Sequence, residues 1–292
     1  MTDSPFSRIW SGFAESKIAL AALVLLAIIV CVALFAPLIS PQNPYDLTQL
    51  DVMDGKLAPG EKSMAGKTHW LGTDDQGRDM LSGIFYGLRI SLAVGLASTL
   101  IAVSIGLSLG LIAAYFGGFV DTLIMRIVDI QLSFPSILLA LILLAIFGPG
   151  VNKVIIALVA VQWAYYTRTV RAAALVETQK EYVEAARVLS LSHRRILFRH
   201  LLPNCLPPLI VVATVQVAHA ISLEATLSFL GLGLPITEPS LGLLISNGFT
   251  YLMSGKYWIS FYPGVALLLT VMAINLVADQ MRDVLNPRLS RN

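Results

Sequence analysis

Long apolar runs separated by polar segments constrain this chain more than any other feature of its sequence. A helix that crosses about 30 Å of hydrocarbon needs about 20 apolar residues, whereas a soluble core needs no such blocks. Charged residues make up 13% of the chain, about half of the share usual in soluble domains. We therefore expect an all-α, polytopic membrane protein with six transmembrane helices. Hydropathy places these spans at residues 18–39, 90–116, 123–147, 151–167, 207–229 and 258–278.

The first apolar run follows Arg8 and Lys17, as the core of a secretory signal peptide would. The run is longer than the about 7–15 residues of such a core, and Pro37 follows Ala36 where cleavage would be expected. We therefore expect a retained first span. Residues 1–89 would then form an N-terminal tail, the first span and an external loop, and residues 90–292 a core domain of five spans.

Lysine and arginine are concentrated in the segment 168–206 and in the C-terminal tail, and cytoplasmic loops of membrane proteins carry such an excess. The bases of these two segments are Arg168, Arg171, Lys180, Arg187, Arg194, Arg195 and Arg199, followed by Arg282, Arg288 and Arg291. The segment 40–89 instead has seven acidic residues against five basic ones. Both termini are therefore expected in the cytoplasm.

The segment 168–206 is longer than a connection between two spans requires, and it predicts two short helices. One face of the first helix carries residues at helical spacing, namely Tyr182, Ala185, Ala186 and Leu189. The two alanines would let this face lie close to another protein, and Arg187 could pair with Glu184. After Ser190 and Ser192, either of which could cap it, the second helix would run through residues 193–202 and stop at Pro203. Such a pair of helices suits docking into a groove on a partner.

Glu184-Ala185-Ala186, the break at Ser190 and Leu202-Pro203 resemble the EAA loop of permease subunits of ABC importers. Further blocks, in the same order as in the peptide and nickel members of that family, are residues 71–79, 86–92, 125–129, 134–135, 223–225, 227–233 and 275–288. On these blocks the chain resembles the second, C-type permease subunit of dipeptide, oligopeptide or nickel importers, a binding-protein-dependent inner-membrane component.

The resemblance implies a type I importer permease fold in a bacterial or archaeal inner membrane, with this chain forming half of the pathway for peptides, nickel chelates or another small solute. The implied ATPase-coupling residues are Glu184, Ala185, Ala186, Arg187, Leu189, Ser190, Leu202 and Pro203. The implied partners are a second homologous permease, two ABC ATPase subunits that use ATP and Mg²⁺, an external solute-binding protein and membrane lipid. The chain itself would bind no cofactor and would not be an enzyme. One alternative is a gradient-driven secondary transporter, which leaves the long segment 168–206 unexplained. Another is a membrane anchor or receptor without transport, which leaves the polar groups within the spans unexplained.

The chain departs from the family pattern at Ser190, where glycine is usual, and at His200, where isoleucine is usual. A serine in a left-handed turn costs about 1 kcal/mol or more relative to glycine. We therefore expect the turn to differ from that of the family, for instance with Ser190 as an N-cap.

Three ionisable residues, Arg126, Asp129 and Glu224, lie within the expected spans, where charges are rare and often functional. For Arg126 and Asp129 a structural ion pair is preferred, with a role in gating as the alternative. For Glu224 we prefer packing against neighbouring helices, with contact to a peptide amino group as the alternative. Gly106 and Gly110 are spaced so that another helix could approach closely, with the alternative that glycine is merely frequent in membrane helices.

Other kinds of site find no support in the sequence. A net charge of +2 gives no basis for binding nucleic acid. The four histidines are too scattered for a metal site, and Cys31 and Cys205 lack the spacing of a disulfide framework. Residues 55–63 approach a phosphate-binding loop, but Glu61 separates its glycine from its lysine. No nucleophile and base occur together as a catalytic pair.

Overall fold

Helices make up nearly all of the regular structure, as the apolar runs require, because a helix satisfies its backbone hydrogen bonds internally in a bilayer. The computed structural model describes residues 5–235 and 237–285, and within these ranges it contains two isolated β-bridges and no strand. The α-helices are α1 (Pro5–Ala14), α2 (Lys17–Ile39), α3 (Met80–Phe116), α4 (Gly118–Leu132), α5 (Ser136–Phe147), α6 (Val151–Thr178), α7 (Glu181–Val188), α8 (His193–Arg195), α9 (Leu202–Phe229), α10 (Leu241–Phe249) and α11 (Trp258–Leu285). Short helical segments are η1 (Leu47–Gln49), η2 (Val52–Asp54), the π-helix η3 (Ile196–Leu201) and η4 (Leu252–Ser254).

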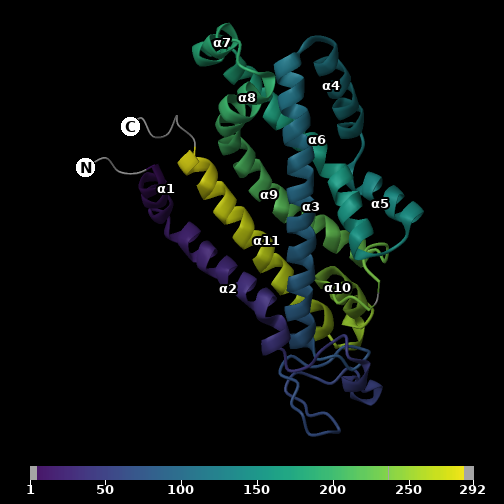
Figure 1. The fold of residues 1–292 in the computed structure, drawn as a ribbon. Helices are drawn as coiled ribbons and strands as arrows, with labels where there is room; N and C mark the ends of the chain where they lie inside the picture. The colour runs from purple at the N-terminus through teal and green to yellow at the C-terminus, as the bar shows by residue number, and fades with distance from the viewer. Residues whose placement is uncertain (1–4, 236, 286–292) are drawn as a thin grey trace.

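The long helices α3, α6, α9 and α11 form the body of the bundle (Figure 1). α3 packs most extensively on α6, and α9 packs on α3, α6 and α11. α2 lies at the edge against α3 and α11 and leaves Val24, Ile28 and Leu38 exposed, as a lipid-facing helix would. The first span is therefore peripheral, and the core is built by the helices that follow it.

Two glycines of α3 set the close approach of α3 and α6. A Cβ atom on Gly106 would overlap the Cβ of Tyr166, and one on Gly110 would lie 2.8 Å from the Cβ of Val170. Such distances are too short for any side chain larger than hydrogen. The expectation that this glycine pair admits a neighbouring helix is confirmed.

Within the described residues, four helical runs are long and apolar enough to cross a membrane, namely α2, α3, the run 193–229 and α11. α4 and α5 pass the same test only together, and they differ in direction by 88°. The span expected over residues 123–147 is therefore broken rather than one continuous helix. Pro135 explains the break, because it lacks an N–H donor and disfavours helix at the residue before it.

α6 is not among these apolar helices, because Lys153, Gln162 and Arg168 interrupt its apolar run. It packs against α3, α4, α5 and α9, so neighbouring protein replaces lipid over much of its surface and its sequence need not be uniformly apolar. That α6 is a sixth span stays a prediction.

Several helices extend further than hydropathy indicates, because residues beyond the hydrocarbon need not be apolar. α3 begins at Met80, where Asp79 accepts a hydrogen bond from the Ser82 amide and caps the helix. The boundary expected after residue 89 thus falls inside α3. α6 continues to Thr178, beyond the expected end at residue 167, and α10 was not expected as a helix.

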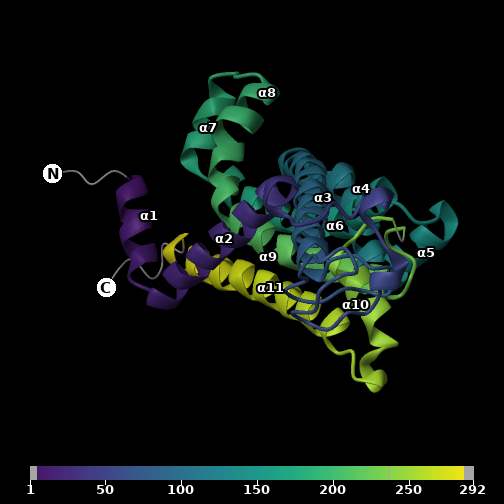
Figure 2. The ribbon, with the colours of Figure 1, turned by 90° about the horizontal axis from the view of Figure 1, so that it is seen from below.

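The two ends of the bundle differ. Figure 1 places α7 and α8 at one end, toward which α1 and the last turns of α11 also lead, and residues 40–79 at the other end. Seen from below, α7 and α8 project beyond the side of the bundle (Figure 2). The basic segment 168–206 therefore shares an end with the helices that lead to both termini. Arg288 and Arg291 lie outside the described residues, and the orientation in the membrane stays a prediction.

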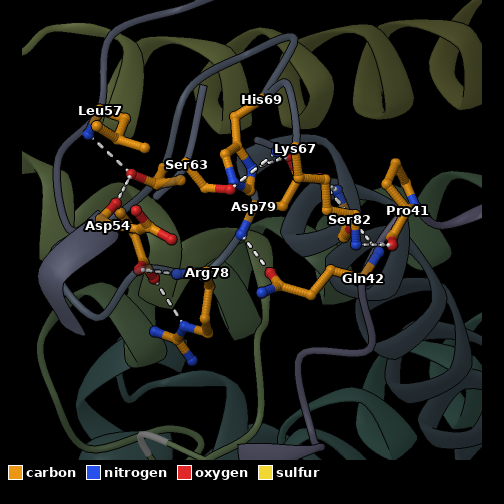
Figure 3. A network of polar contacts seen from close by, with 12 residues as sticks. Pro41, Gln42, Asp54, Leu57, Ser63, Lys67, His69, Arg78, Asp79 and Ser82 are labelled. Atoms are coloured by element: carbon orange, nitrogen blue, oxygen red, sulfur yellow. Dashed lines mark hydrogen bonds and ion pairs between the residues drawn. The ribbon is translucent and has the colours of Figure 1, made fainter. Parts of the chain in front are cut away.

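A buried polar network organises the segment 40–79 at the opposite end (Figure 3). Arg78 Nε donates to Asp74 Oδ2 at 2.7 Å, and the two side chains are only 3% and 0% exposed. The Asp79 amide donates to Gln42 Oε1 at 2.6 Å, and Asp79 Oδ1 lies 2.9 Å from His69 Nδ1. The family-like block 71–79 thus builds a turn that fixes the start of α3.

Asp74→Asn is expected to lower the stability of the protein by about 3–5 kcal/mol, because it removes the carboxylate bonded to a buried guanidinium. Thermal unfolding of the purified protein in mild detergent measures the effect. Glu61→Gln, at an exposed carboxylate of the same segment, is the control and should change little. Equal unfolding temperatures for the two variants would show that the Asp74–Arg78 pair does not hold this segment.

Candidate functional site

α7 carries the residues that the sequence singled out, but it presents a different face from the expected one. Val183 and Ala186 are buried against the rest of the chain, whereas Glu184 and Ala185 are exposed. The two alanines therefore do not share an outward face, and the expectation that Ala186 lies on the exposed face of the helix is wrong. Successive side chains of an α-helix point in directions about 100° apart, so residues three positions apart share a face. Ala186 therefore faces inward together with Val183, and Ala185 does not.

Apolar side chains extend the exposed face of α7 at its C-terminal end. Val188 is 84% exposed and Leu189 72% exposed. Together with Glu184 and Ala185 they form what we call the α7 face. Exposed apolar residues that adjoin one another in a polar segment are typical of surfaces that a partner protein covers.

A hydrogen-bond network ties α7 to the ends of two long helices. Tyr182 Oη donates to Glu177 Oε2 at 2.6 Å, and Asn204 Nδ2 donates to Tyr182 Oη at 3.1 Å. Lys180 Nζ lies 2.6 Å from Glu177 Oε1. These contacts connect the end of α6, the start of α7 and the start of α9. Sequence reasoning placed Tyr182 on a helical face and did not detect its link to Glu177 and Asn204.

The pKa values of Tyr182 and Glu177 agree with the roles of these residues as hydrogen-bond donor and acceptor. Burial, followed by the hydrogen bond to Glu177, raises the pKa of Tyr182 to about 12, so its hydroxyl stays protonated at neutral pH and donates. Burial raises the pKa of Glu177, but the hydrogen bonds from Lys180 and Tyr182 outweigh it, and the net pKa is lowered. The stabilisation from Glu177 is therefore present above its unfolded pKa and is lost as the pH falls through its folded pKa.

Arg187 contacts an aromatic ring rather than Glu184. Its guanidinium lies 5.5 Å from the ring centre of Tyr115 at the end of α3, and Tyr115 Oη lies 2.7 Å from His193 Nδ1. Among the described residues Glu184 forms no salt bridge, so the expected Glu184–Arg187 pair is wrong. The ring of Tyr115 offers Arg187 a cation–π contact instead, which leaves Glu184 free to meet a partner.

Ser190 adopts the left-handed conformation that its family position requires, with φ of 52°. The Ser190 amide donates to the Arg187 carbonyl at 2.9 Å, and the Leu191 amide donates to the Ala186 carbonyl at 3.1 Å. This pair of bonds is a Schellman motif, which ends helices with a left-handed residue. The expected departure from a left-handed turn, for instance with Ser190 as an N-cap, is therefore wrong, and Ser192 occupies the N-cap position before α8.

Ser190→Gly is expected to raise the stability of the protein by up to about 1 kcal/mol, because glycine adopts the left-handed conformation without a steric penalty. Thermal unfolding of the purified protein measures the change. Ser192→Gly is the control, because Ser192 has negative φ and glycine there only adds freedom to the unfolded chain. A decrease for Ser190→Gly as large as that for Ser192→Gly would contradict strain at Ser190.

The second expected helix does not stop at Pro203. α8, the π-helix η3 and α9 form one helical run from residue 193 to residue 229. Pro203 lies in the first turn of α9, where a missing N–H is tolerated. The π-helix immediately before it shifts the hydrogen-bond register. Leu202 is half-buried and Pro203 exposed, and their part in coupling stays a prediction.

The ion pair of Asp129 involves a different arginine from the expected one. Arg168 Nη2 lies 2.5 Å from Asp129 Oδ1, and Arg171 pairs with Asp121. Arg126 is exposed and forms no salt bridge among the described residues. The expected Arg126–Asp129 pair is therefore wrong, because the extension of α6 brings its own arginines beside α4.

Glu224 of α9 is fully buried, at 0% exposure. Its carboxylate accepts hydrogen bonds from Ser91 of α3 at 2.9 Å and from Ser228 at 2.8 Å. These contacts are those of a packing residue. A role in the translocation pathway, for Glu224 as for Arg126 and Asp129, stays a prediction.

Comparison with known proteins identifies the class to which this fold and segment belong. In fold the chain resembles the permease of the methionine ABC transporter MetNI in an inward-facing conformation, with a TM-score of 0.57, 22% identity and coverage of 71% of this chain and 98% of that chain. The fold is thus that of a type I ABC importer permease. Residues 106–291 match the family "binding-protein-dependent transport system inner membrane component", and residues 4–59 match the "N-terminal TM domain of oligopeptide transport permease C".

Two curated relatives extend over nearly the whole chain. The dipeptide transport system permease protein DppC of Escherichia coli (strain K12) is 43% identical over 289 residues, which are 99% of this chain and 95% of that protein. The di/tripeptide transport system permease protein of Pseudomonas aeruginosa (strain UCBPP-PA14) is 40% identical over 98% of this chain and 93% of its own length. The chain belongs to the binding-protein-dependent transport system inner membrane component family, as a multi-pass permease subunit of an ABC importer. The expected family is confirmed, and the relatives are transport components rather than enzymes.

Proposed function

We propose that this chain forms half of the membrane pathway through which an ABC importer takes up dipeptides and other short peptides. The observation that carries this proposal is the 43% identity to a dipeptide permease over nearly the full length of both chains. The other half of the pathway is a second, homologous permease. An external solute-binding protein delivers the peptide at the end formed by residues 40–79, and both termini lie in the cytoplasm of a bacterial or archaeal cell.

Two ABC ATPase subunits supply the energy, and the α7 face is the surface on which one of them docks. Glu184, Ala185 and Leu189 point away from the chain, so an ATPase cleft can cover them without disturbing the fold. When the ATPase dimer closes on ATP and Mg²⁺, it displaces α7. The hydrogen bonds of Tyr182 to Glu177 and Asn204 pass the displacement to α6 and α9, and the permease pair switches between its inward- and outward-facing states. This chain itself binds no cofactor.

Uptake by the purified complex in proteoliposomes tests this function. With the binding protein on one side and ATP and Mg²⁺ on the side of the ATPases, we expect accumulation of labelled dialanine. Dissipating ion gradients with ionophores should leave the rate unchanged, and omitting ATP should abolish uptake. Accumulation driven by a proton or sodium gradient without ATP would refute the proposal.

A further inference from the structure

A pocket of about 510 Å³, with polar side chains on an otherwise apolar lining, lies among α4, α6, α9 and α11. Its polar lining consists of Tyr165, Arg168, Thr169, Gln216 and Arg282. This volume falls within the about 300–1,000 Å³ of pockets that bind small molecules. Polar side chains on membrane helices avoid lipid and face protein, water or a transported solute.

The charged lining of the pocket is entirely positive. Arg168 and Arg282 both line it, and no carboxylate of the described residues does. Arg168 is partly neutralised by Asp129, 2.5 Å away on α4. Arg282 forms no salt bridge among the described residues. The pocket therefore carries a positive charge that its own walls do not balance, which favours an anionic occupant.

Besides the two arginines, Gln216 offers the pocket a hydrogen-bond donor without an acceptor. Its side-chain Nε2 is buried and has no hydrogen-bond partner among the described residues. Buried amide N–H groups are nearly always paired, so an unpaired one on a pocket wall indicates an acceptor that enters the pocket. A carboxylate suits this arrangement, because its oxygens accept from an amide and from a guanidinium together.

The depth of Gln216 favours a transported solute over a lipid headgroup. Gln216 lies near the middle of α9 (Leu202–Phe229), about 20 Å along the helix from its first residue at 1.5 Å per residue. Arg168 and Arg282 belong to segments expected in the cytoplasm, so a phospholipid phosphate at the membrane surface can meet these two arginines, but it does not reach Gln216. A small solute on its way through the bundle does.

We propose that this pocket binds the carboxylate of the transported solute, with Gln216 Nε2 and the Arg282 guanidinium as donors and Arg168 adding positive charge. The proposal rests on the proposed function. It narrows the substrate class to small solutes with a free carboxylate, a group that a peptide with an unblocked C-terminus carries.

Protection of an engineered cysteine tests the pocket in the assembled complex. Val215→Cys on the pocket wall, with exposed Cys31 replaced by serine, is labelled in nanodiscs by a neutral methanethiosulfonate reagent. Dialanine should slow the labelling, and dialanine amide, which lacks the carboxylate, should not. Arg282→Gln should raise the dialanine concentration needed for half-protection about tenfold or more, because it removes a charged hydrogen bond. Lys17→Gln, an exposed cation that does not line the pocket, should have no effect.

A second reporter and the uptake assay separate the possible failures. Ala172→Cys, on the α6 wall of the same pocket, should give the same pattern if Val215→Cys impairs folding. Equal protection by dialanine and its amide, or no protection in a complex that still imports dialanine, would overturn the carboxylate site and leave the proposed function intact. Protection that follows phosphatidylglycerol content instead of dialanine would assign the pocket to a lipid headgroup. If the wild-type complex does not take up dialanine when ATP is supplied, the proposed function itself is refuted.

Discussion

Glu184→Lys and Ala185→Trp together are expected to reduce ATP-driven peptide uptake at least about tenfold while leaving the chain in the membrane at its normal abundance. Both residues lie on the α7 face and make no contact that the fold needs. Substitutions at the centre of a protein interface commonly cost about 2 kcal/mol or more, which is about thirtyfold in affinity. The double variant should therefore release the ATPase and reduce uptake by at least about tenfold. Uptake in proteoliposomes, normalised to the amount of permease, measures the effect.

Two matched variants show whether the α7 face is responsible. Glu15→Lys reverses an exposed charge at the turn between α1 and α2 and should leave uptake unchanged. Ala186→Trp places a large ring at a buried position of the same helix, so it should lower abundance through overpacking rather than uncouple a folded complex. Normal uptake by Glu184→Lys with Ala185→Trp, at equal abundance, would remove the coupling assignment.

Gly106→Leu is expected to prevent stable folding of the permease. A Cβ at this position already overlaps Tyr166, and the backbone of Trp163 lies 2.8 Å from it. Backbone atoms cannot rotate away as a flexible side chain can, so α3 and α6 must separate along their whole contact. Overpacking a tight interior costs about 1–3 kcal/mol or more. Fluorescence-detected size exclusion in mild detergent should show aggregated or degraded protein.

Gly264→Ala provides the control for Gly106→Leu. Gly264 lies in α11, and an added Cβ there meets no atom within 4 Å. Alanine is the better helix former by about 0.5–1 kcal/mol, so this variant should elute as the wild type does or be slightly more stable. A monodisperse, active Gly106→Leu protein would contradict the close packing of α3 on α6.

The sequence predicted the parts of this structure that depend on local pattern. Apolar runs locate membrane helices because hydrocarbon accepts little else, and Gly106 and Gly110 mark a helix crossing because only glycine fits there. The left-handed turn at Ser190 could be located from family resemblance. Its conformation with serine could not, because the Schellman hydrogen bonds that hold it depend on the backbone positions of Ala186 and Arg187.

Partners distant in sequence account for the wrong predictions. Arg168 and Arg171 were assigned to a loop, but Asp129 and Asp121 of α4 hold them on an extended α6. Arg187 had a suitable partner one turn away in Glu184, and the ring of Tyr115, 72 positions earlier in the chain, took its place. The pocket around Gln216 and Arg282 is lined by residues from four helices, so no short sequence motif could predict it.

Affinity purification of the full chain from its native membrane in mild detergent, with stoichiometric partners identified by mass spectrometry, tests the central claim most directly. We expect an ABC ATPase and a second permease to co-purify with the wild-type chain. The variant carrying Glu184→Lys and Ala185→Trp should retain the second permease and lose the ATPase. Recovery of the chain without an ATPase, or retention of the ATPase by the variant at wild-type stoichiometry, would contradict docking through the α7 face.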